Sequence, residues 1–211
     1  MKPYYQDDYC TIYHGDCREV ELETYDLLLT DPPYGIGEAA GKNKSRVQLA
    51  LPTDYGDSTW DDEPVSDWLL SAMRLVCEKH MIFGGNYYDL PPTSCWLIWD
   101  KMNGGSDFAD CEMVWTNLKG AVRLKRHQWN GMLRKGKEAR WHPTQKPLEI
   151  MSWCLQQAGE VKSVLDPWMG SGTTLRACKD RSIHSVGIEI NEKYCEIAAQ
   201  RLSQEVLDFG C

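Results

Sequence analysis

The sequence lacks any long hydrophobic run. Among its 211 residues, no stretch of about 18 is apolar enough to cross a membrane. The first ten residues, MKPYYQDDYC, also lack the apolar segment of a signal peptide. We therefore expect a cytoplasmic protein with no membrane partner.

Cysteine is abundant, but the patterns that give it a structural or metal-binding role are missing. The nine cysteines are an odd number and include no C-x-x-C pair, which argues against a disulfide framework and against a zinc ribbon. Positions such as Cys77, Cys154 and Cys178 are expected to be small buried hydrophobic side chains in a reducing compartment. No metal site is predicted.

Positive charge is scarce overall but concentrated in one segment. The net charge is −8, yet residues 119–146 contain nine Lys or Arg and one acid, so this segment carries +8 and the rest of the chain −16. Because salt screens distant charges, a basic face on an acidic body can bind a polyanion locally. A solvated basic loop is the alternative.

The order of apolar segments predicts an α/β fold in a single domain, residues 1–211. Short β-branched or aromatic runs alternate with helix-like stretches, which favours a doubly wound, mostly parallel sheet with helices on both faces. Asn191 is expected to cap the last helix, and Pro147 to lie in the first turn of an earlier one. The predicted strands are Tyr9–Tyr13, Tyr25–Thr30, His80–Phe83, Cys95–Trp99, Glu112–Trp115, Ala121–Lys125, Ser163–Leu165 and His184–Ile188. The predicted helices are Val65–Glu78, Pro147–Ala158, Thr173–Asp180 and Glu192–Val206.

Two segments have no regular pattern. Residues 36–62 are rich in Gly, Lys, Asn, Ser and Asp, and a loop of this length is typical of a mobile lid or binding loop, or of disorder. Residues 117–142 are basic and contain Trp129 and Trp141, and we expect a small recognition insertion there.

The stretch SVLDPWMGSGTTLRACK, residues 163–179, is typical of a strand, a glycine-rich turn and a helix. Gly170 and Gly172 permit close approach of a ligand to the backbone, and the following helix presents unpaired N–H groups. Glu189 ends the next strand 19 residues after Gly170. At that spacing an acid contacts ribose hydroxyls in nucleotide-binding βαβ units.

Missing residues narrow the choice of nucleotide. No Gly-Lys-Ser/Thr follows the turn, which argues against a phosphate-binding P-loop, and the third glycine of a dinucleotide fingerprint is absent. Asp166 at the strand end would repel a pyrophosphate but suits a cationic amino-acid moiety. These features favour S-adenosylmethionine as the cofactor, with its ribose near Glu189.

Three motifs in one order resemble those of bacterial and phage DNA amino-methyltransferases. DPPY at 31–34, HPTQKP at 142–147 and DPWMGSGTT at 166–174 follow the order of that family's permuted β class, over a span from Tyr13 to about Leu202. The resemblance implies a circularly permuted, Rossmann-like class I methyltransferase fold, S-adenosylmethionine as cofactor, double-stranded DNA as substrate, and a bacterial or phage origin. Trp168 stands where the family usually has Phe, and a larger aromatic ring still covers an adenine.

The resemblance also assigns residues. Asp16, in YHGDC, matches the acid that contacts the adenine amino group of the cofactor, and HPTQKP matches the segment beside the methionine end, where Lys146 is expected to pair with a carboxylate. The implied catalytic residues are Asp31, Pro32, Pro33 and Tyr34. The expected cofactor-binding residues are Asp16, Asp31, Thr144, Gln145, Lys146, Asp166, Pro167, Trp168, Gly170, Ser171, Gly172, Thr173 and Glu189.

The corner LLLTDPPYGIG, residues 27–37, allows a structural and a chemical interpretation. Two prolines and an aspartate end a strand, but they also suit methylation of an exocyclic amine, whose lone pair is delocalised into the base ring. The Asp31 carboxylate and the Pro32 carbonyl can accept hydrogen bonds from both N–H groups and pull the nitrogen toward tetrahedral geometry. Tyr34 offers a flat face to a base flipped out of the duplex.

The basic segment lies where the resembled family inserts its target-recognition region. A region this small implies a short or relaxed target, a homodimer, or a partner protein. Phosphate contacts position a protein on DNA without specifying sequence. The expected DNA-binding residues are Arg123, Lys125, Arg126, Trp129, Arg134, Lys135, Lys137 and Arg140. Core burial is the alternative for the two tryptophans of this region.

The identity of residue 31 favours adenine as the target base. In the resembled family, Asp at this position is commoner among adenine-N6 enzymes and Ser among cytosine-N4 enzymes, so cytosine N4 is the second choice. A catalytically silent DNA-binding subunit is a further alternative, against which the intact DPPY motif and glycine loop argue. A nicotinamide-dependent dehydrogenase is disfavoured by the missing third glycine.

Overall fold

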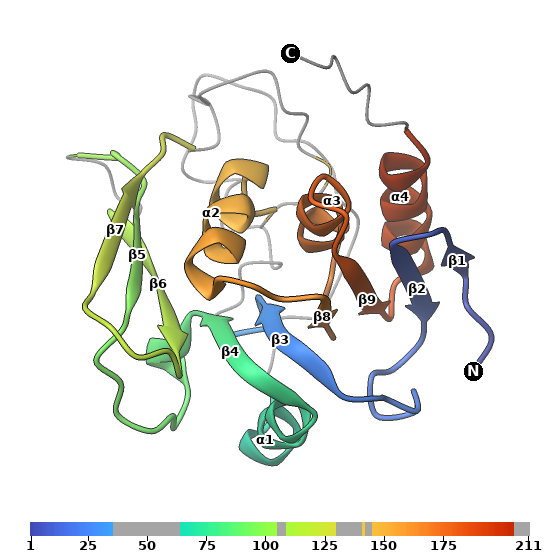
Figure 1. The fold of residues 1–211 in the computed structure, drawn as a ribbon, viewed down its shortest axis with the longest axis horizontal. Helices are drawn as coiled ribbons and strands as arrows, with labels where there is room; N and C mark the ends of the chain where they lie inside the picture. The colour runs from blue at the N-terminus through green and yellow to red at the C-terminus, as the bar shows by residue number, and fades with distance from the viewer. Residues whose placement is uncertain (36–63, 105–108, 130–140, 142–144, 205–211) are drawn as a thin grey trace.

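The computed structural model describes residues 1–35, 64–104, 109–129, 141 and 145–204 (Figure 1). Within these ranges, nine strands form one sheet in the order β1-β2-β9-β8-β3-β4-β6-β5-β7. The strands are β1 (Tyr5–Gln6), β2 (Cys10–His14), β3 (Tyr25–Thr30), β4 (Cys77–Phe83), β5 (Leu97–Asp100), β6 (Cys111–Thr116), β7 (Arg123–Arg126), β8 (Ser163–Asp166) and β9 (His184–Glu189).

The centre of the sheet is parallel. Strands β2, β9, β8, β3 and β4 pair in parallel with their neighbours. On one side, β6 pairs antiparallel with both β4 and β5, and β7 continues the sheet parallel to β5. On the other side, β1 pairs antiparallel with β2. The predicted mostly parallel sheet is confirmed.

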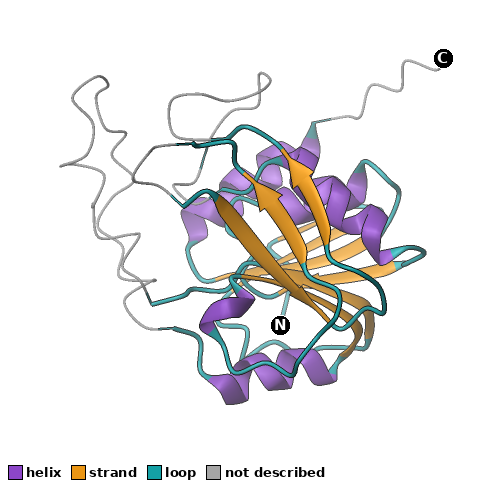
Figure 2. Ribbon diagram, turned by 90° about the vertical axis from the view of Figure 1, so that its left-hand side faces the viewer, coloured by secondary structure: helices purple, strands orange, loops and turns teal. Residues whose placement is uncertain are grey.

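Helices cover both faces of the sheet. Figure 1 shows α1 on one face, and α2, α3 and α4 on the opposite face. Figure 2, turned by a right angle, shows the same sheet between the two helical layers. The α-helices are α1 (Asp67–Leu75), α2 (Leu148–Ala158), α3 (Thr173–Lys179) and α4 (Glu192–Ser203), and a short 3₁₀ helix, η3, covers Gly85–Tyr87.

Strand β3 shows why the apolar run before the DPPY motif is continuous. Its side chains alternate between the faces of the sheet, so Leu27 and Leu29 pack in the cluster that includes α2, whereas Leu28 packs with residues of α1. All three leucines are fully buried. A central parallel strand covered on both faces requires such a run, and it fixes where Asp31 emerges.

The predicted elements exist, but several boundaries are wrong: β4 begins at Cys77 rather than His80, β5 at Leu97 rather than Cys95, and β7 at Arg123 rather than Ala121. Each predicted strand and helix has a counterpart, whereas β1 and η3 were not predicted. The helix expected to run to Glu78 ends at Leu75, because Cys77 already pairs with Tyr25 in the parallel ladder of β3 and β4. The predicted cap is confirmed, since the Asn191 side chain accepts a hydrogen bond of 3.0 Å from the Lys193 N–H.

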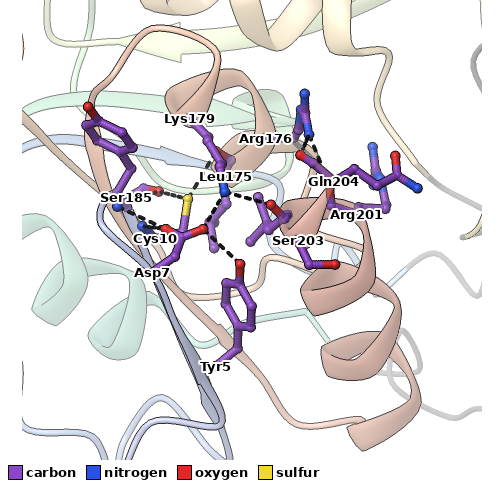
Figure 3. A network of polar contacts seen from close by, with 12 residues as sticks. Tyr5, Asp7, Cys10, Leu175, Arg176, Lys179, Ser185, Arg201, Ser203 and Gln204 are labelled. Carbon is purple, nitrogen blue, oxygen red and sulfur yellow. Dashed lines mark hydrogen bonds and ion pairs between the residues drawn. The ribbon is translucent and has the colours of Figure 1, made fainter. Parts of the chain in front are cut away.

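A polar network fastens α3 to α4 and to the N-terminal segment (Figure 3). The Lys179 ammonium lies 2.5 Å from the Asp7 carboxylate and donates a second bond, 2.7 Å long, to the Leu202 carbonyl. The Arg176 guanidinium donates to the Gln204 carbonyl at 3.1 Å. These bonds satisfy carbonyls at the end of α4 that have no intrahelical partner.

The cysteines of the described residues are free thiols, and seven of these eight are buried. Cys77, Cys154 and Cys178 are among the buried ones, as predicted. No helix in the described ranges has both the length and the apolar character needed to cross a membrane.

Candidate active site

A cavity of about 820 Å³ opens at the carboxyl ends of the parallel strands. Much of its wall comes from four neighbouring strand ends, namely residues 14–18 at the end of β2, Asp31 and Pro33 after β3, 166–171 at the end of β8 and 188–192 at the end of β9. Ligands of doubly wound sheets bind at this edge, and the volume suits a nucleotide-sized molecule.

The glycine loop forms one wall, and its two glycines have different tasks. Gly170 lines the cavity with φ +52°, and its N–H donates to the Glu189 carboxylate at 3.0 Å. Gly172, with φ +75°, does not line the cavity. A Cβ at Gly172 would lie 2.8 Å from the Cβ of Ala198 in α4. Gly172 therefore permits α4 to pack closely against the loop, and its predicted role in cofactor binding stays a prediction.

Four acidic residues besides Asp31 line the cavity, namely Asp16, Asp166, Glu189 and Glu192. Asp16 pairs with Arg18, which keeps the pKa of that carboxyl low. Burial raises the pKa of Asp166 to about 6, although the carboxylate accepts a 2.7 Å hydrogen bond from the Thr30 hydroxyl. Burial likewise raises the pKa of Glu189 to about 7. The cavity is therefore acidic and suits a ligand that donates hydrogen bonds and carries positive charge.

The DPPY corner holds its carboxylate between two donors. The Tyr34 hydroxyl donates to one oxygen of Asp31, and the Lys146 ammonium pairs with the other. The predicted pairing of Lys146 with a carboxylate is confirmed. The Pro33 carbonyl accepts a 2.5 Å hydrogen bond from the Tyr88 hydroxyl. These contacts fix the orientation of Asp31 at the cavity wall.

The Tyr34 ring is packed as well as hydrogen-bonded. It stacks on Tyr87, with centroids 5.0 Å apart and planes 19° apart. Gly84, with φ +62°, makes room for this ring, since a Cβ there would lie 2.2 Å from a Tyr34 ring carbon. The Pro32 carbonyl accepts no hydrogen bond from the described residues.

The structure brings most of the predicted site residues together. Asp31 and Pro33 line the cavity, whereas Pro32 and Tyr34 are not among its lining residues. Thr144 falls outside the described residues. The other predicted cofactor residues that line the cavity are Asp16, Gln145, Lys146, Asp166, Pro167, Trp168, Gly170, Ser171, Thr173 and Glu189.

Arg201 supports the glycine loop and was not predicted as a site residue. From α4, its guanidinium donates to the Ser171 carbonyl at 2.5 Å, to the Ser171 hydroxyl at 3.1 Å and to the Thr173 hydroxyl at 3.2 Å. Both loop residues line the cavity. In the sequence, Arg201 is a polar position on a C-terminal helix, and only the packing of α4 against the loop reveals its role.

One predicted DNA contact is corrected by the structure. Trp129 is only 8% exposed and belongs to the hydrophobic cluster beneath α2. Its ring packs near His127, with centroids 6.3 Å apart. A residue buried in this way cannot stack on a nucleic-acid base, so core packing explains the tryptophan. Trp141, by contrast, is 46% exposed.

The remaining predicted DNA-binding residues fall into two groups. Arg123, Lys125 and Arg126 lie on the edge strand β7. Lys125 pairs with Glu149 at 2.6 Å, and Arg126 pairs with Asp100 at 3.2 Å. The second group, Arg134, Lys135, Lys137 and Arg140, lies outside the described residues, as does the expected loop at 36–62.

Solved structures of DNA methyltransferases share the fold of this chain. The M1.HpyAVI–SAM complex superimposes with a TM-score of 0.56 at 22% identity, covering 92% of this chain and 100% of that chain. The cytosine-N4-specific PvuII DNA methyltransferase superimposes with a TM-score of 0.59 at 14% identity, covering 98% and 91% of the two chains.

The chain belongs to the DNA methylase family N6_N4_Mtase, whose family model matches residues 92–200, just over half of its length. It is 28% identical to the type II methyltransferase M.ScaI of Streptomyces caespitosus, over 97% of this chain and 84% of that protein. It is 24% identical to M.HpaI of Haemophilus parainfluenzae, over 91% and 72%. The protein is thus an S-adenosylmethionine-dependent DNA amino-methyltransferase.

Proposed function

We propose that the protein methylates the exocyclic N6 amine of adenine in double-stranded DNA, using Asp31 to orient that amine. The observation that carries this proposal is the position of the Asp31 carboxylate. It lines the same cavity as the glycine loop, and Tyr34 and Lys146 hold it there. Aspartate rather than serine at this position supports adenine as the target.

The lining of the cavity fits S-adenosylmethionine. Glu189 and Asp16 would accept hydrogen bonds from the ribose hydroxyls and the adenine amino group, and Trp168 would cover the adenine ring. Asp166 and the Gln145–Lys146 segment would lie at the methionine end, with Thr144 beside them in the sequence. When bound, the cofactor supplies a methyl group on a positively charged sulfur, which an acid-lined cavity suits.

Asp31 would act on the amine before the methyl group moves. Its carboxylate keeps lone pairs beyond those used by Tyr34 and Lys146. It would accept one amine N–H, and the Pro32 carbonyl, which accepts no bond from described residues, would accept the other. Both acceptors are fixed before reaction by the proline backbone and by the donors around Asp31, so little reorganisation is required.

The methyl transfer would need no reagent other than the cofactor and the amine. The amine lone pair would form the new N–C bond, the C–S electron pair would remain with the departing neutral thioether, and the proton lost by the amine would pass to the Asp31 carboxylate that accepts its N–H. Tyr34 would support the flipped base through its packed ring, for which Gly84 leaves room. Alignment of the reacting atoms would supply most of the rate enhancement.

The basic segment would hold the DNA. Arg123, Lys125 and Arg126 lie on an edge strand and would approach phosphates together with the basic residues of 130–140. Residues 117–142 would form a recognition region, and residues 36–62 a mobile loop near the DPPY corner, within one methyltransferase domain. A homodimer would enlarge so small a recognition surface.

The test identifies the modified nucleoside. Duplex DNA of mixed sequence is incubated with the protein and methyl-labelled S-adenosylmethionine, digested, and separated into nucleosides. We expect labelled N6-methyladenine from the parent protein and at least about a hundredfold less from Asp31→Asn in the same time. Labelled N4-methylcytosine would refute the adenine assignment. Cofactor and DNA binding without any labelled nucleoside would instead indicate a catalytically silent subunit.

A further inference from the structure

Four alternating charges run from the cavity wall into the sheet. Asp31 follows β3, Lys146 precedes α2, Glu112 lies in β6 and Lys101 follows β5. Lys146 pairs with Asp31 and also lies 3.3 Å from one oxygen of Glu112. Lys101 lies 2.6 Å from the other Glu112 oxygen. Glu112 and Lys101 do not line the cavity.

These charges are largely removed from water. The Lys146 side chain is 8% exposed, and those of Asp31, Glu112 and Lys101 are about one-fifth exposed. Buried charges are tolerated when each has a partner of opposite sign. The two carboxylates and two ammonium groups cancel, so the cluster as a whole is neutral.

The directions of the pKa shifts of Asp31, Glu112 and Lys146 agree with one ammonium shared between two carboxylates. Burial raises the pKa of Asp31, Lys146 opposes the rise, and the negative charge of Glu112 adds to it. Burial acts to raise the pKa of Glu112 as well, but Lys146 and Lys101 outweigh it, so this carboxyl is ionised more readily than usual. Burial acts to lower the pKa of Lys146, but the two carboxylates outweigh it and raise the pKa.

We propose that Glu112 is a positioning residue for the methyl transfer: it shares Lys146 with Asp31, so that less of the ammonium charge neutralises the carboxylate that accepts the amine. A carboxylate paired with an ammonium of its own is a weaker acceptor, because the pair is locally neutral. With Glu112 present, the charge of Lys146 is divided between two carboxylates. This inference rests on the proposed role of Asp31.

Several titratable groups face Asp31, and each of them influences the pKa of its carboxyl. Tyr34 belongs to the same corner, Lys146 precedes α2, Glu112 comes from β6, and Asp166 lies at the end of β8. Among these, Glu112 is the group whose charge can be removed without changing a residue of the cavity lining.

The experiment measures the pKa of Asp31 and the methylation rate in the same variants. The carboxyl carbon of Asp31 is followed by ¹³C NMR titration, with its signal assigned by its loss in Asp31→Asn. The single-turnover rate is measured against pH at saturating cofactor and DNA. Glu112→Gln should lower the pKa of Asp31 and reduce the rate about tenfold, with cofactor and DNA affinities changed less than twofold. Glu112→Asp, which restores the charge, should recover part of the rate.

In a second variant, the pKa of Asp31 should shift in the opposite direction. Lys101→Met removes one of the two ammonium partners of Glu112, so Glu112 draws more strongly on Lys146 and the pKa of Asp31 should rise. Asp180→Asn is the control, since it breaks a 2.9 Å pair with Arg176 on α3 away from the cavity. It should leave both the pKa and the rate unchanged.

The inference is overturned if Glu112→Gln folds and leaves the rate and the pKa of Asp31 at parental values. If Glu112→Gln does not fold, an unshifted pKa in Lys101→Met overturns it instead. A parent protein that methylates no DNA would refute the proposed function alone, because the NMR titration of Asp31 still reads the coupling to Glu112 directly.

Discussion

Replacement of Arg201 by methionine should weaken cofactor binding, although Arg201 does not line the cavity. The guanidinium makes three hydrogen bonds to Ser171 and Thr173, which do line it. A hydrogen bond to a charged donor contributes about 1.5–3 kcal/mol. One partly exposed guanidinium makes all three bonds, so we expect their combined loss to reduce the free energy that orders the loop by about 2 kcal/mol. The dissociation constant of the cofactor should then rise by up to about 30-fold.

Isothermal titration of S-adenosylmethionine into Arg201→Met and Arg201→Lys measures this loss directly. The lysine variant retains a charged donor and should show an intermediate affinity. Arg176→Met is the matched control, because the Arg176 side chain donates to the carbonyls of Arg201 and Gln204 and pairs with Asp180, and none of these described partners lines the cavity (Figure 3). A folded Arg201→Met that binds the cofactor as tightly as the parent would refute the reasoning, as would an equal loss in Arg176→Met.

Three further changes test other parts of the site. Tyr34→Phe removes the hydroxyl that donates to Asp31, so the single-turnover rate should fall about tenfold or more while cofactor affinity is kept; an unchanged rate would remove that hydroxyl from the account. Gly84→Ala places a Cβ 2.2 Å from the Tyr34 ring at φ +62°, and denaturant unfolding should show a loss of about 1–3 kcal/mol; parental stability would contradict the packing described here. Burial raises the pKa of Glu189 from 4.5 to about 7, so the folded state binds this proton more tightly and the free energy of unfolding should fall as pH rises from 4.5 to 7. Glu189→Gln should lack that decrease, which is about 3 kcal/mol for a shift of this size, and an identical pH dependence in parent and variant would refute it.

The sequence predicts the framework of the site because local patterns determine it. The apolar run of β3 and the prolines after it place Asp31 at a strand end, and the glycine turn after β8 lies at the same edge of the sheet. Parallel strands bring such ends together in any doubly wound fold. The acid at the end of β9, Glu189, follows from the same rule.

Residues brought in by sheet register or helix packing could not be predicted in this way. Glu112 meets Lys146 because β6 pairs antiparallel with β5, with Trp99 opposite Glu112. No local pattern specifies that register. Arg201 reaches the glycine loop only because Gly172 allows α4 to pack closely.

In the basic segment, too, part of the structure could not be predicted from the sequence. Its charge is evident in the sequence, but hydrophobicity alone does not decide whether a tryptophan within it is exposed. Trp129 packs in the core whereas Trp141 is exposed. The tertiary contacts of each ring, rather than the composition of the segment, separate the two.

The most direct test of the central claim is the single-turnover methylation rate of Asp31→Asn at saturating cofactor and duplex DNA. The asparagine has the size of the aspartate but no negative charge with which to accept the amine. We predict a rate at least about a hundredfold below that of the parent, with DNA binding retained. A variant that methylates DNA at the parental rate would contradict the claim that the Asp31 carboxylate orients the reacting amine.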